Sequence, residues 1–170
     1  DGLGPYAELV RRLQSAAGRQ FNWVRDVTVS NSTWGNRAVD LGGPWDGVHA
    51  LGGGIGQGMQ MAIGAAIAAP DRRVICLVGD GGLQVNIGEL TTAAQENVNL
   101  VMILMNSRDY EVIKNIQDAA YGGRKHYSDI YAPDFEAIAS GAGWFYQKLS
   151  GLDRASTVLA GALQTQGATM

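Results

Sequence analysis

Residues 74–82 read VICLVGDGG, and residues 100–110 read LVMILMNSRDY. Each stretch starts with a continuous apolar run and then changes abruptly to Gly, Asp, Asn or Ser. A short apolar run bounded by turn residues is typical of a strand that is buried on both faces of a parallel sheet. Parallel neighbours in a sheet need a crossover connection, which is usually a helix. The two stretches therefore predict an α/β fold.

The rest of the chain repeats this alternation of strand and helix patterns. Further strands are expected over residues 23–30 and 144–149, and residues 31–47, which are punctuated by Asn, Gly and Pro, predict a loop. Helices are expected over residues 6–17, 54–69, 86–96, 111–120, 133–140 and 152–163. Such alternation predicts a three-layer, doubly wound parallel sheet with helices on both faces.

The composition is that of an ordinary globular chain apart from its glycines. The chain has 170 residues, of which 24 are Gly, and it is 46% hydrophobic and 17% charged. This length suits one domain with a substantial core. The formal net charge of −3 argues against a nucleic-acid partner held by phosphate contacts. The most apolar segment, residues 59–69, is too short for a membrane span, so no membrane partner is expected.

The single cysteine, Cys76, lies within an apolar run and has no partner for an internal disulfide. It is interpreted as a buried thiol, which fits a reducing, cytoplasmic location. The first residue is Asp rather than Met, and residues 167–170 resemble the beginning of a strand. We therefore expect residues 1–170 to be one domain of a larger enzyme, either a fragment of it or a separate single-domain subunit.

The ends of the predicted strands carry the candidate chemistry, because parallel sheets bind ligands at the carboxyl ends of their strands. The glycines around Asp80 would let backbone amides approach a phosphate closely. A carboxylate among them would repel that phosphate unless a cation, such as Mg²⁺, lay between the two. Taken alone, GDG is better explained as a turn that ends the strand, with Asp80 as a helix N-cap. Ser107 follows the next strand, 27 residues later, which brings a second set of oxygen donors to the same edge.

Residues 79–110, GDGGLQVNIGELTTAAQENVNLVMILMNSRDY, resemble the thiamine diphosphate motif, in which GDG is followed some two dozen residues later by Asn-Asn. The segments GGGIGQGMQMAIGAAIAAP and YEVIKNIQDAAYGGR are similar to the cofactor-binding domain of the acetolactate synthase and benzoylformate decarboxylase group. The resemblance covers about residues 5–170. It implies a thiamine diphosphate-binding fold, with thiamine diphosphate and Mg²⁺ as cofactors.

The resemblance also implies roles for individual residues. Asp80, Ser107 and the carbonyl group of Asp109 would bind the metal. Gly81 and Gly82 would donate backbone N–H groups to the diphosphate, and Tyr110 would border that end of the cofactor. Ser107 stands where the family motif has Asn, and its hydroxyl is shorter than an amide side chain. The site would then use a bridging water, bind the metal through Asn106 instead, or bind the metal weakly. The structural alternative is that Ser107 is an ordinary residue of a backbone turn.

Two further segments are implicated by the resemblance. Gly53, Gly54 and Ile55 align with the platform that supports the pyrimidine ring, where the apolar side chain holds the cofactor in a bent shape; a tightly packed helix start is the structural alternative. Ser30 and Asn31 would contact the diphosphate. His49 precedes the platform and is the candidate catalytic residue at the substrate space, although a structural histidine fits equally well. Asp26 lies within a predicted strand and is interpreted as structural.

The implied function is a thiamine diphosphate- and Mg²⁺-binding domain of an enzyme that acts on a 2-oxo acid by decarboxylation, carboligation or both. In this family a glutamate of a separate pyrimidine-binding domain completes the site, so we expect that domain or subunit as a partner in a homo- or hetero-oligomer and little activity from this chain alone. Two other classes remain open: a non-catalytic cofactor-binding or assembly domain, and a nucleotide-binding Rossmann-like module. The particular 2-oxo acid is not indicated by the sequence.

Overall fold

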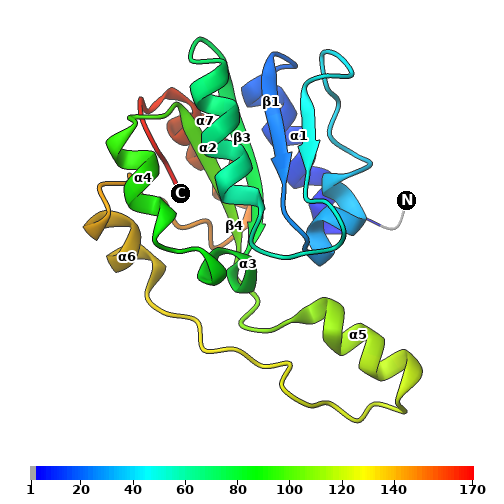
Figure 1. The fold of residues 1–170 in the computed structure, drawn as a ribbon. Coiled ribbons are helices and arrows are strands. Elements are labelled where there is room, and N and C mark those ends of the chain that lie inside the picture. The colour runs from blue at the N-terminus through cyan, green and yellow to red at the C-terminus, as the bar shows by residue number, and fades with distance from the viewer. Residues whose placement is uncertain (1–2) are drawn as a thin grey trace.

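The computed structural model describes residues 3–170, and its centre is a four-stranded parallel sheet. The strands lie in the order β2-β1-β3-β4, so the chain starts inside the sheet and then crosses outward on both sides (Figure 1). Their bounds are β1 (Phe21–Arg25), β2 (Gly47–His49), β3 (Arg73–Gly79) and β4 (Leu100–Met105). The two apolar runs of the sequence form β3 and β4, which are parallel neighbours in the sheet, as predicted.

Helices cover both faces of the sheet, which confirms the three-layer α/β fold. Successive side chains of a strand point to opposite faces of the sheet, so they enter two different cores. Trp23 and Ile75 pack with residues 9–13 and 155–159 on one face. Val24 and Cys76 pack with residues 59–66, 90–93 and 135–139 on the other face. The helices are α1 (Pro5–Ala17), α2 (Gly58–Ala68), α3 (Asp80–Val85), α4 (Glu89–Gln95), α5 (Glu111–Ala120), α6 (Phe135–Gly141) and α7 (Ala155–Gln164), with a π-helical turn η1 (Asn31–Gly35) and a 3₁₀ turn η2 (Leu152–Arg154).

Helix α5 differs from the others because it projects away from the sheet (Figure 1). None of its ten residues, all of which the structure describes, is buried. A long extended segment returns from α5 to α6 along the lower edge of the molecule in Figure 1. Among the described residues, no helix is both long enough and apolar enough to cross a membrane.

The last residues of the chain extend the sheet beside β4. The N–H of Thr169 donates to the Leu100 carbonyl at 2.9 Å, and the N–H of Met102 donates to the Thr169 carbonyl at 2.7 Å. On the other side, the N–H of Phe145 donates to the Ala168 carbonyl at 3.0 Å. The strand expected over residues 144–149 is thus reduced, within the described part of the chain, to an isolated parallel bridge between Phe145 and Thr169.

The strand expected over residues 23–30 was too long, and so was the loop expected over 31–47. Strand β1 ends at Arg25, and the chain then turns into a helical segment that includes η1. The Thr28 hydroxyl accepts the N–H of Ser30 at 3.0 Å, and the Thr28 carbonyl accepts the N–H of Ser32 at 3.1 Å. This hydrogen bond from the Ser30 N–H to the Thr28 side chain starts the helical turn. Residues 27–29 are β-branched and favour a strand locally, but the side-chain bond offers the backbone an alternative to the strand. Residues 47–49 add the short edge strand β2.

Two helices also begin and end differently from the prediction. Helix α2 starts at Gly58 rather than at residue 54, because the preceding glycines adopt left-handed backbone angles, with φ of +70° at Gly53 and +84° at Gly56. The segment after β3 forms the short helix α3, which was not predicted, and the helix expected over 86–96 is confined to α4.

Thr169 provides a test of packing at the sheet edge. Its side chain is fully buried, and its hydroxyl has no hydrogen-bond partner among residues 3–170. An unsatisfied buried hydroxyl costs about 1–3 kcal/mol. Thr169→Val should therefore raise the free energy of unfolding by about 1 kcal/mol, measured by urea denaturation.

Thr165→Val is the matched control, because the Thr165 hydroxyl donates to the Gly161 carbonyl at 2.8 Å. That variant loses a made hydrogen bond and should be less stable by about 1 kcal/mol. Equal destabilisation by both substitutions would contradict the assignment of Thr169 as unsatisfied.

Candidate functional site

A cavity of about 830 Å³ opens at the carboxyl ends of β1, β3 and β4. It lies between the sheet and α5, and a glycine-rich loop before α2 contributes to its wall. This is the edge at which the sequence placed the ligand site. Most of the expected site residues line it: Ser30, Gly53, Ile55, Asp80, Gly81, Gly82, Ser107, Asp109 and Tyr110.

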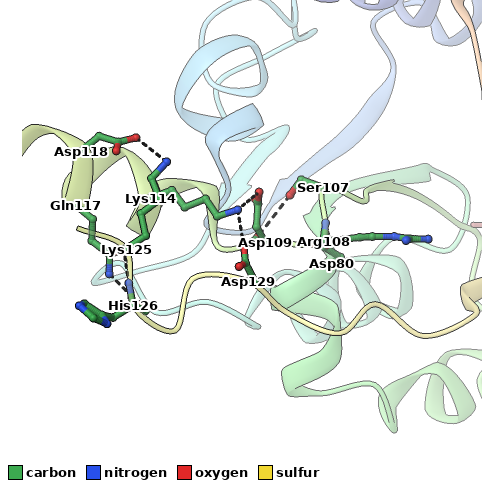
Figure 2. Close-up of polar contacts among 10 residues, drawn as sticks. All are labelled: Asp80, Ser107, Arg108, Asp109, Lys114, Gln117, Asp118, Lys125, His126 and Asp129. Atoms are coloured by element: carbon green, nitrogen blue, oxygen red, sulfur yellow. Dashed lines mark hydrogen bonds and ion pairs between the residues drawn. The ribbon is translucent and has the colours of Figure 1, made fainter. Parts of the chain in front are cut away.

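Asp80 is the central carboxylate of this cavity. Its side chain is 2% exposed, and burial raises its pKa. One carboxylate oxygen accepts the backbone N–H of Arg108 at 2.6 Å, and the other accepts the N–H of Gly81 at 2.9 Å. The loop after β4 therefore reaches across the sheet to Asp80, as expected from adjacent parallel strands. Figure 2 shows the Arg108 guanidinium extending away from Asp109 and Lys114, so it is the backbone of Arg108 that contacts Asp80.

The loop after β4, residues 106–110, also carries oxygen donors that are not carboxylates. The Ser107 hydroxyl donates to the Asp109 carbonyl oxygen at 3.3 Å (Figure 2). Among residues 3–170, no group of three or more His, Cys, Asp or Glu side chains is placed to hold a metal. A cation here would therefore have one carboxylate, a hydroxyl and a carbonyl as protein ligands. Mg²⁺ suits such a sparse set, because it keeps waters or phosphate oxygens in its remaining positions.

Lys114 is a residue of this region that the sequence analysis did not single out. Its ammonium group lies 2.9 Å from an Asp109 oxygen and 2.6 Å from an Asp129 oxygen (Figure 2). Both contacts raise the pKa of Lys114, and the contact with Asp109 has the larger effect. The position of Lys114 five residues after Asp109, near the start of a predicted helix, was an available signal for the first contact. The contact with Asp129 depends on how the returning segment folds.

Backbone hydrogen bonds join the same two segments. The N–H of Tyr110 donates to the Ser128 carbonyl at 2.7 Å, and the N–H of Ile130 donates to the Arg108 carbonyl at 3.1 Å. Arg108 itself has a left-handed backbone, with φ of +61°. The loop over residues 106–110, which carries the candidate metal ligands after β4, is therefore held on one side by Asp80 and on the other by residues 128–130.

The glycine-rich loop before α2 forms the other wall of the cavity. Gly53 and Ile55 line it, whereas Gly54 does not. The Gln57 amide nitrogen donates to the carbonyl groups of Leu51 and Gly54, each at 2.9 Å, and so holds the loop closed. The Ile55 side chain is 38% exposed and faces the cavity. This arrangement fits the expected platform, in which an apolar side chain stands free of the core.

Two expected site residues lie elsewhere. Asn31 belongs to η1 and does not line the cavity; its side-chain oxygen accepts from Arg25 at 3.4 Å. His49 is exposed on the edge strand β2, with its Nδ1 2.9 Å from the Ala50 carbonyl, and it does not line the cavity either. A catalytic role for His49 stays a prediction that the geometry of this chain does not support. The expectation rested on closeness in sequence to the platform, but β2 lies at the edge of the sheet.

Asp26 lies behind the wall of the cavity, next to residues that line it, although the sequence analysis assigned it only to a strand. It is fully buried, and burial raises its pKa, opposed by hydrogen bonds from backbone amides. Both of its oxygens lie close to the N–H of Gly56, at 3.1 and 3.0 Å. The sequence analysis placed Asp26 inside the strand predicted over residues 23–30, and only the earlier end of β1 at Arg25 brings it to the edge of the sheet.

The fold and the cavity define a cofactor-binding α/β domain, and comparison with known proteins identifies its family. Residues 28–170 match the family described as "Thiamine pyrophosphate enzyme, C-terminal TPP binding domain". The chain belongs to this family.

Individual relatives agree with this assignment. The chain is 37% identical to the acetolactate synthase isozyme 3 large subunit of Escherichia coli (strain K12) over 92 residues, which are 54% of this chain and 16% of that protein. It is 34% identical to the acetolactate synthase large subunit of Parasynechococcus marenigrum (strain WH8102) over 131 residues, 75% of this chain and 21% of the relative. The chain thus spans a small part of the length of the curated relatives that it matches.

A solved structure is similar over nearly the whole chain. The thiamine diphosphate-dependent 4-hydroxybenzoylformate decarboxylase of Rhodococcus jostii RHA1 superposes with a TM-score of 0.86 at 27% sequence identity. The match covers 96% of this chain and 31% of that protein. The chain is therefore a TPP-binding domain of the kind found in acetolactate synthase- and decarboxylase-like enzymes, as the motifs predicted.

The ion pairs of Lys114 should control the order of the loop over residues 106–110. Lys114→Met keeps the length of the side chain but removes both contacts. We expect the Tyr110 and Ile130 amides to exchange with deuterium about fivefold faster, a modest effect because the ion pairs are partly screened by solvent. Hydrogen–deuterium exchange with mass spectrometry measures this.

Lys125→Met is the matched control, because Lys125 pairs with Asp118 at 3.1 Å farther along the α5 segment. It should leave exchange at Tyr110 and Ile130 unchanged. Equal exchange in the unsubstituted protein and in Lys114→Met would show that Lys114 does not order this loop.

Proposed function

We propose that the cavity binds thiamine diphosphate through a Mg²⁺ ion held by the Asp80 carboxylate, the Ser107 hydroxyl and the Asp109 carbonyl. The observation that carries the proposal is the meeting of the two strand ends, with an Asp80 oxygen 2.6 Å from the Arg108 nitrogen. Asp80 is held in the cavity wall by this contact, beside the loop that carries the other donors. Family membership supports the cofactor, and the oxygen-only donor set supports the metal.

The glycines after β3 suit the diphosphate end of the cofactor. Gly81 and Gly82 line the cavity and are buried in the first turn of α3, where backbone N–H groups have no partner within the helix. The N–H of Gly81 donates to the Asp80 carboxylate, which leaves the N–H of Gly82 as the proposed donor to the diphosphate. A Cβ atom at Gly81 would come within 2.5 Å of the Tyr110 ring. Any larger residue there would push the ring or the loop out of place, which supports the role of Tyr110 as a neighbour of the diphosphate. Ser30 adds a hydroxyl on the β1 side of the cavity.

The platform of Gly53, Gly54 and Ile55 is proposed to support the pyrimidine ring. The left-handed backbone at Gly53, with φ of +70°, leaves the loop without side chains on that side of Ile55. The exposed Ile55 side chain would then be the apolar support against which the pyrimidine end of the cofactor packs. When bound, thiamine diphosphate supplies the electron sink for chemistry beside a carbonyl group, whereas the protein supplies orientation and exclusion of water.

The names of the relatives support the proposed reaction class. Their names, acetolactate synthase and 4-hydroxybenzoylformate decarboxylase, support an enzyme that acts on a 2-oxo acid by decarboxylation or carboligation. Val112 and Ile116 of α5 line the cavity and would form an apolar wall of the substrate space. The buried, unpaired thiol of Cys76 supports a cytoplasmic location.

A partner domain is also part of the proposal. Ile113 and Ile116 are 42% and 50% exposed on α5, so one side of the cavity has an apolar wall that this chain leaves uncovered. Of the glutamates, Glu111 lines the cavity, but it directly follows Tyr110 on the diphosphate side. A pyrimidine-binding domain, from the same polypeptide or from another subunit of an oligomer, would cover the wall and contribute the missing acid.

Removing the Asp80 carboxylate should abolish metal-dependent cofactor binding. In the assembled enzyme, Asp80→Ala is expected to weaken thiamine diphosphate binding at least about thirtyfold, or about 2 kcal/mol, because a buried charged contact is lost. Isothermal titration calorimetry with Mg²⁺ and with EDTA measures this. The unsubstituted enzyme should show the same loss in EDTA.

Asp71→Ala is the control, since Asp71 is exposed just before β3, at the other end of that strand, and the change in charge is identical. It should bind as the unsubstituted enzyme does. Tight binding of NAD instead of thiamine diphosphate would favour the Rossmann-like alternative. Absence of binding by the whole assembly would favour a structural domain.

The isolated chain should turn over little or no 2-oxo acid, and addition of its pyrimidine-binding domain should restore activity. A screen of 2-oxo acids, read as carbon dioxide release and as carboligation product, measures this and identifies the substrate. The chain with Asp80→Ala, mixed with the same partner, controls for contaminating enzyme. Full turnover by the purified chain alone would refute the requirement for a partner.

A further inference from the structure

Asp26 is a buried carboxylate to which the proposed function gives no role. It directly follows β1, and its N–H donates to the Leu77 carbonyl of β3 at 2.9 Å, so its backbone is fixed to the centre of the sheet. Its side chain is fully buried. Within residues 3–170, no cationic side chain forms an ion pair with it. A buried carboxylate is costly unless its oxygens accept hydrogen bonds.

Backbone amides supply those hydrogen bonds. One Asp26 oxygen accepts the N–H of Val27 at 2.7 Å, and both oxygens lie within 3.1 Å of the N–H of Gly56. Gly56 is the last residue of the platform loop before Gln57 and α2. Asp26 thereby ties the platform to the end of β1.

The glycines around Asp26 show how closely it is enclosed. A Cβ atom at Gly82 would lie 2.6 Å from an Asp26 oxygen, and a Cβ atom at Gly58 would lie 2.7 Å from the Asp26 Cβ. Gly82 belongs to the first turn of α3, residues 80–82, which is proposed to bind the diphosphate, and Gly58 starts α2. The Asp26 side chain therefore lies between the platform side of the cavity and its diphosphate side, in contact with both.

A second contact holds Gly56 from the opposite direction. The Asn86 amide nitrogen donates to the Gly56 carbonyl at 2.8 Å, and Asn86 directly follows α3. Gly56 has φ of +84°, and a Cβ atom there would lie 2.8 Å from the Val85 Cβ. The N–H of Gly56 is thus bound by Asp26 and its carbonyl by Asn86, so both backbone polar groups of this residue are engaged.

We propose that Asp26 is a positioning residue that sets the separation between the platform loop, residues 53–56, and the diphosphate turn, residues 80–82 at the start of α3. The proposal rests on the proposed function, because it assigns those two parts of the cavity to the two ends of thiamine diphosphate. A ligand that binds at both ends is sensitive to their separation, and a small displacement of one wall weakens binding without loss of any direct contact. Asp26 itself lies behind the cavity wall and touches no ligand.

The test compares a ligand that needs both walls with one that needs a single wall. Asp26→Asn preserves shape but turns one acceptor oxygen into an NH₂ donor that faces backbone N–H groups. In the assembled enzyme with Mg²⁺, we expect this variant to bind thiamine diphosphate about tenfold more weakly. Inorganic pyrophosphate, which requires the metal and the diphosphate turn but not the platform loop, should bind within about twofold of the unsubstituted enzyme. Calorimetry measures both affinities, and Asp71→Asn is the control for the change in charge.

Equal weakening of both ligands would overturn the proposal, because it would indicate general damage to the site, and so would unchanged affinity for thiamine diphosphate. If Asp26→Asn does not fold, Asn86→Ala decides by the same comparison. It removes the other bond to Gly56 at a partly exposed position and should weaken thiamine diphosphate about threefold while leaving pyrophosphate unchanged. Failure of the unsubstituted enzyme to bind thiamine diphosphate would instead refute the proposed function on which this inference rests.

Discussion

The hydrogen bond from the Arg108 backbone to the Asp80 carboxylate is the contact on which the candidate site depends. It spans the carboxyl ends of β3 and β4 with a length of 2.6 Å, and it lies in a region where Asp80 is almost completely buried. A buried carboxylate demands such donors, so the loop after β4 is drawn over the sheet rather than into solvent. The remaining oxygen donors reach the cavity only because this loop is held there.

The wall formed by α5 depends on the same loop. None of the described α5 residues is buried, so the helix gains little from packing against this chain. It is held at its base, where residues 108–110 pair with residues 128–130 and Lys114 joins Asp109 to Asp129. Figure 1 shows the resulting projection of α5 from the sheet. A helix with an uncovered apolar face next to a cofactor cavity fits a domain that works together with another.

The glycines of the chain serve two different purposes, which sequence patterns do not separate. Gly53 and Gly56 adopt left-handed backbone angles that the platform loop requires. Gly58 and Gly82 are instead small because Asp26 occupies the space where a side chain would be. The enclosed carboxylate explains why two glycine-rich segments, far apart in the sequence, come together behind one wall of the cavity.

The sequence by itself determined the parallel α/β sheet and the edge at which the candidate site lies. The reason is that VICLV and LVMILM are continuous apolar runs followed by small and polar residues, a pattern that depends on local chemistry alone. It also indicated Asp80 and the loop over 106–110 as neighbours. Only the tertiary structure decided the end of β1, the enclosure of Asp26, the ion pairs of Lys114 and the position of His49 away from the cavity. Each of these depends on groups that are distant in the sequence, or on which strand lies at the sheet edge, and such contacts have no local periodicity to indicate them.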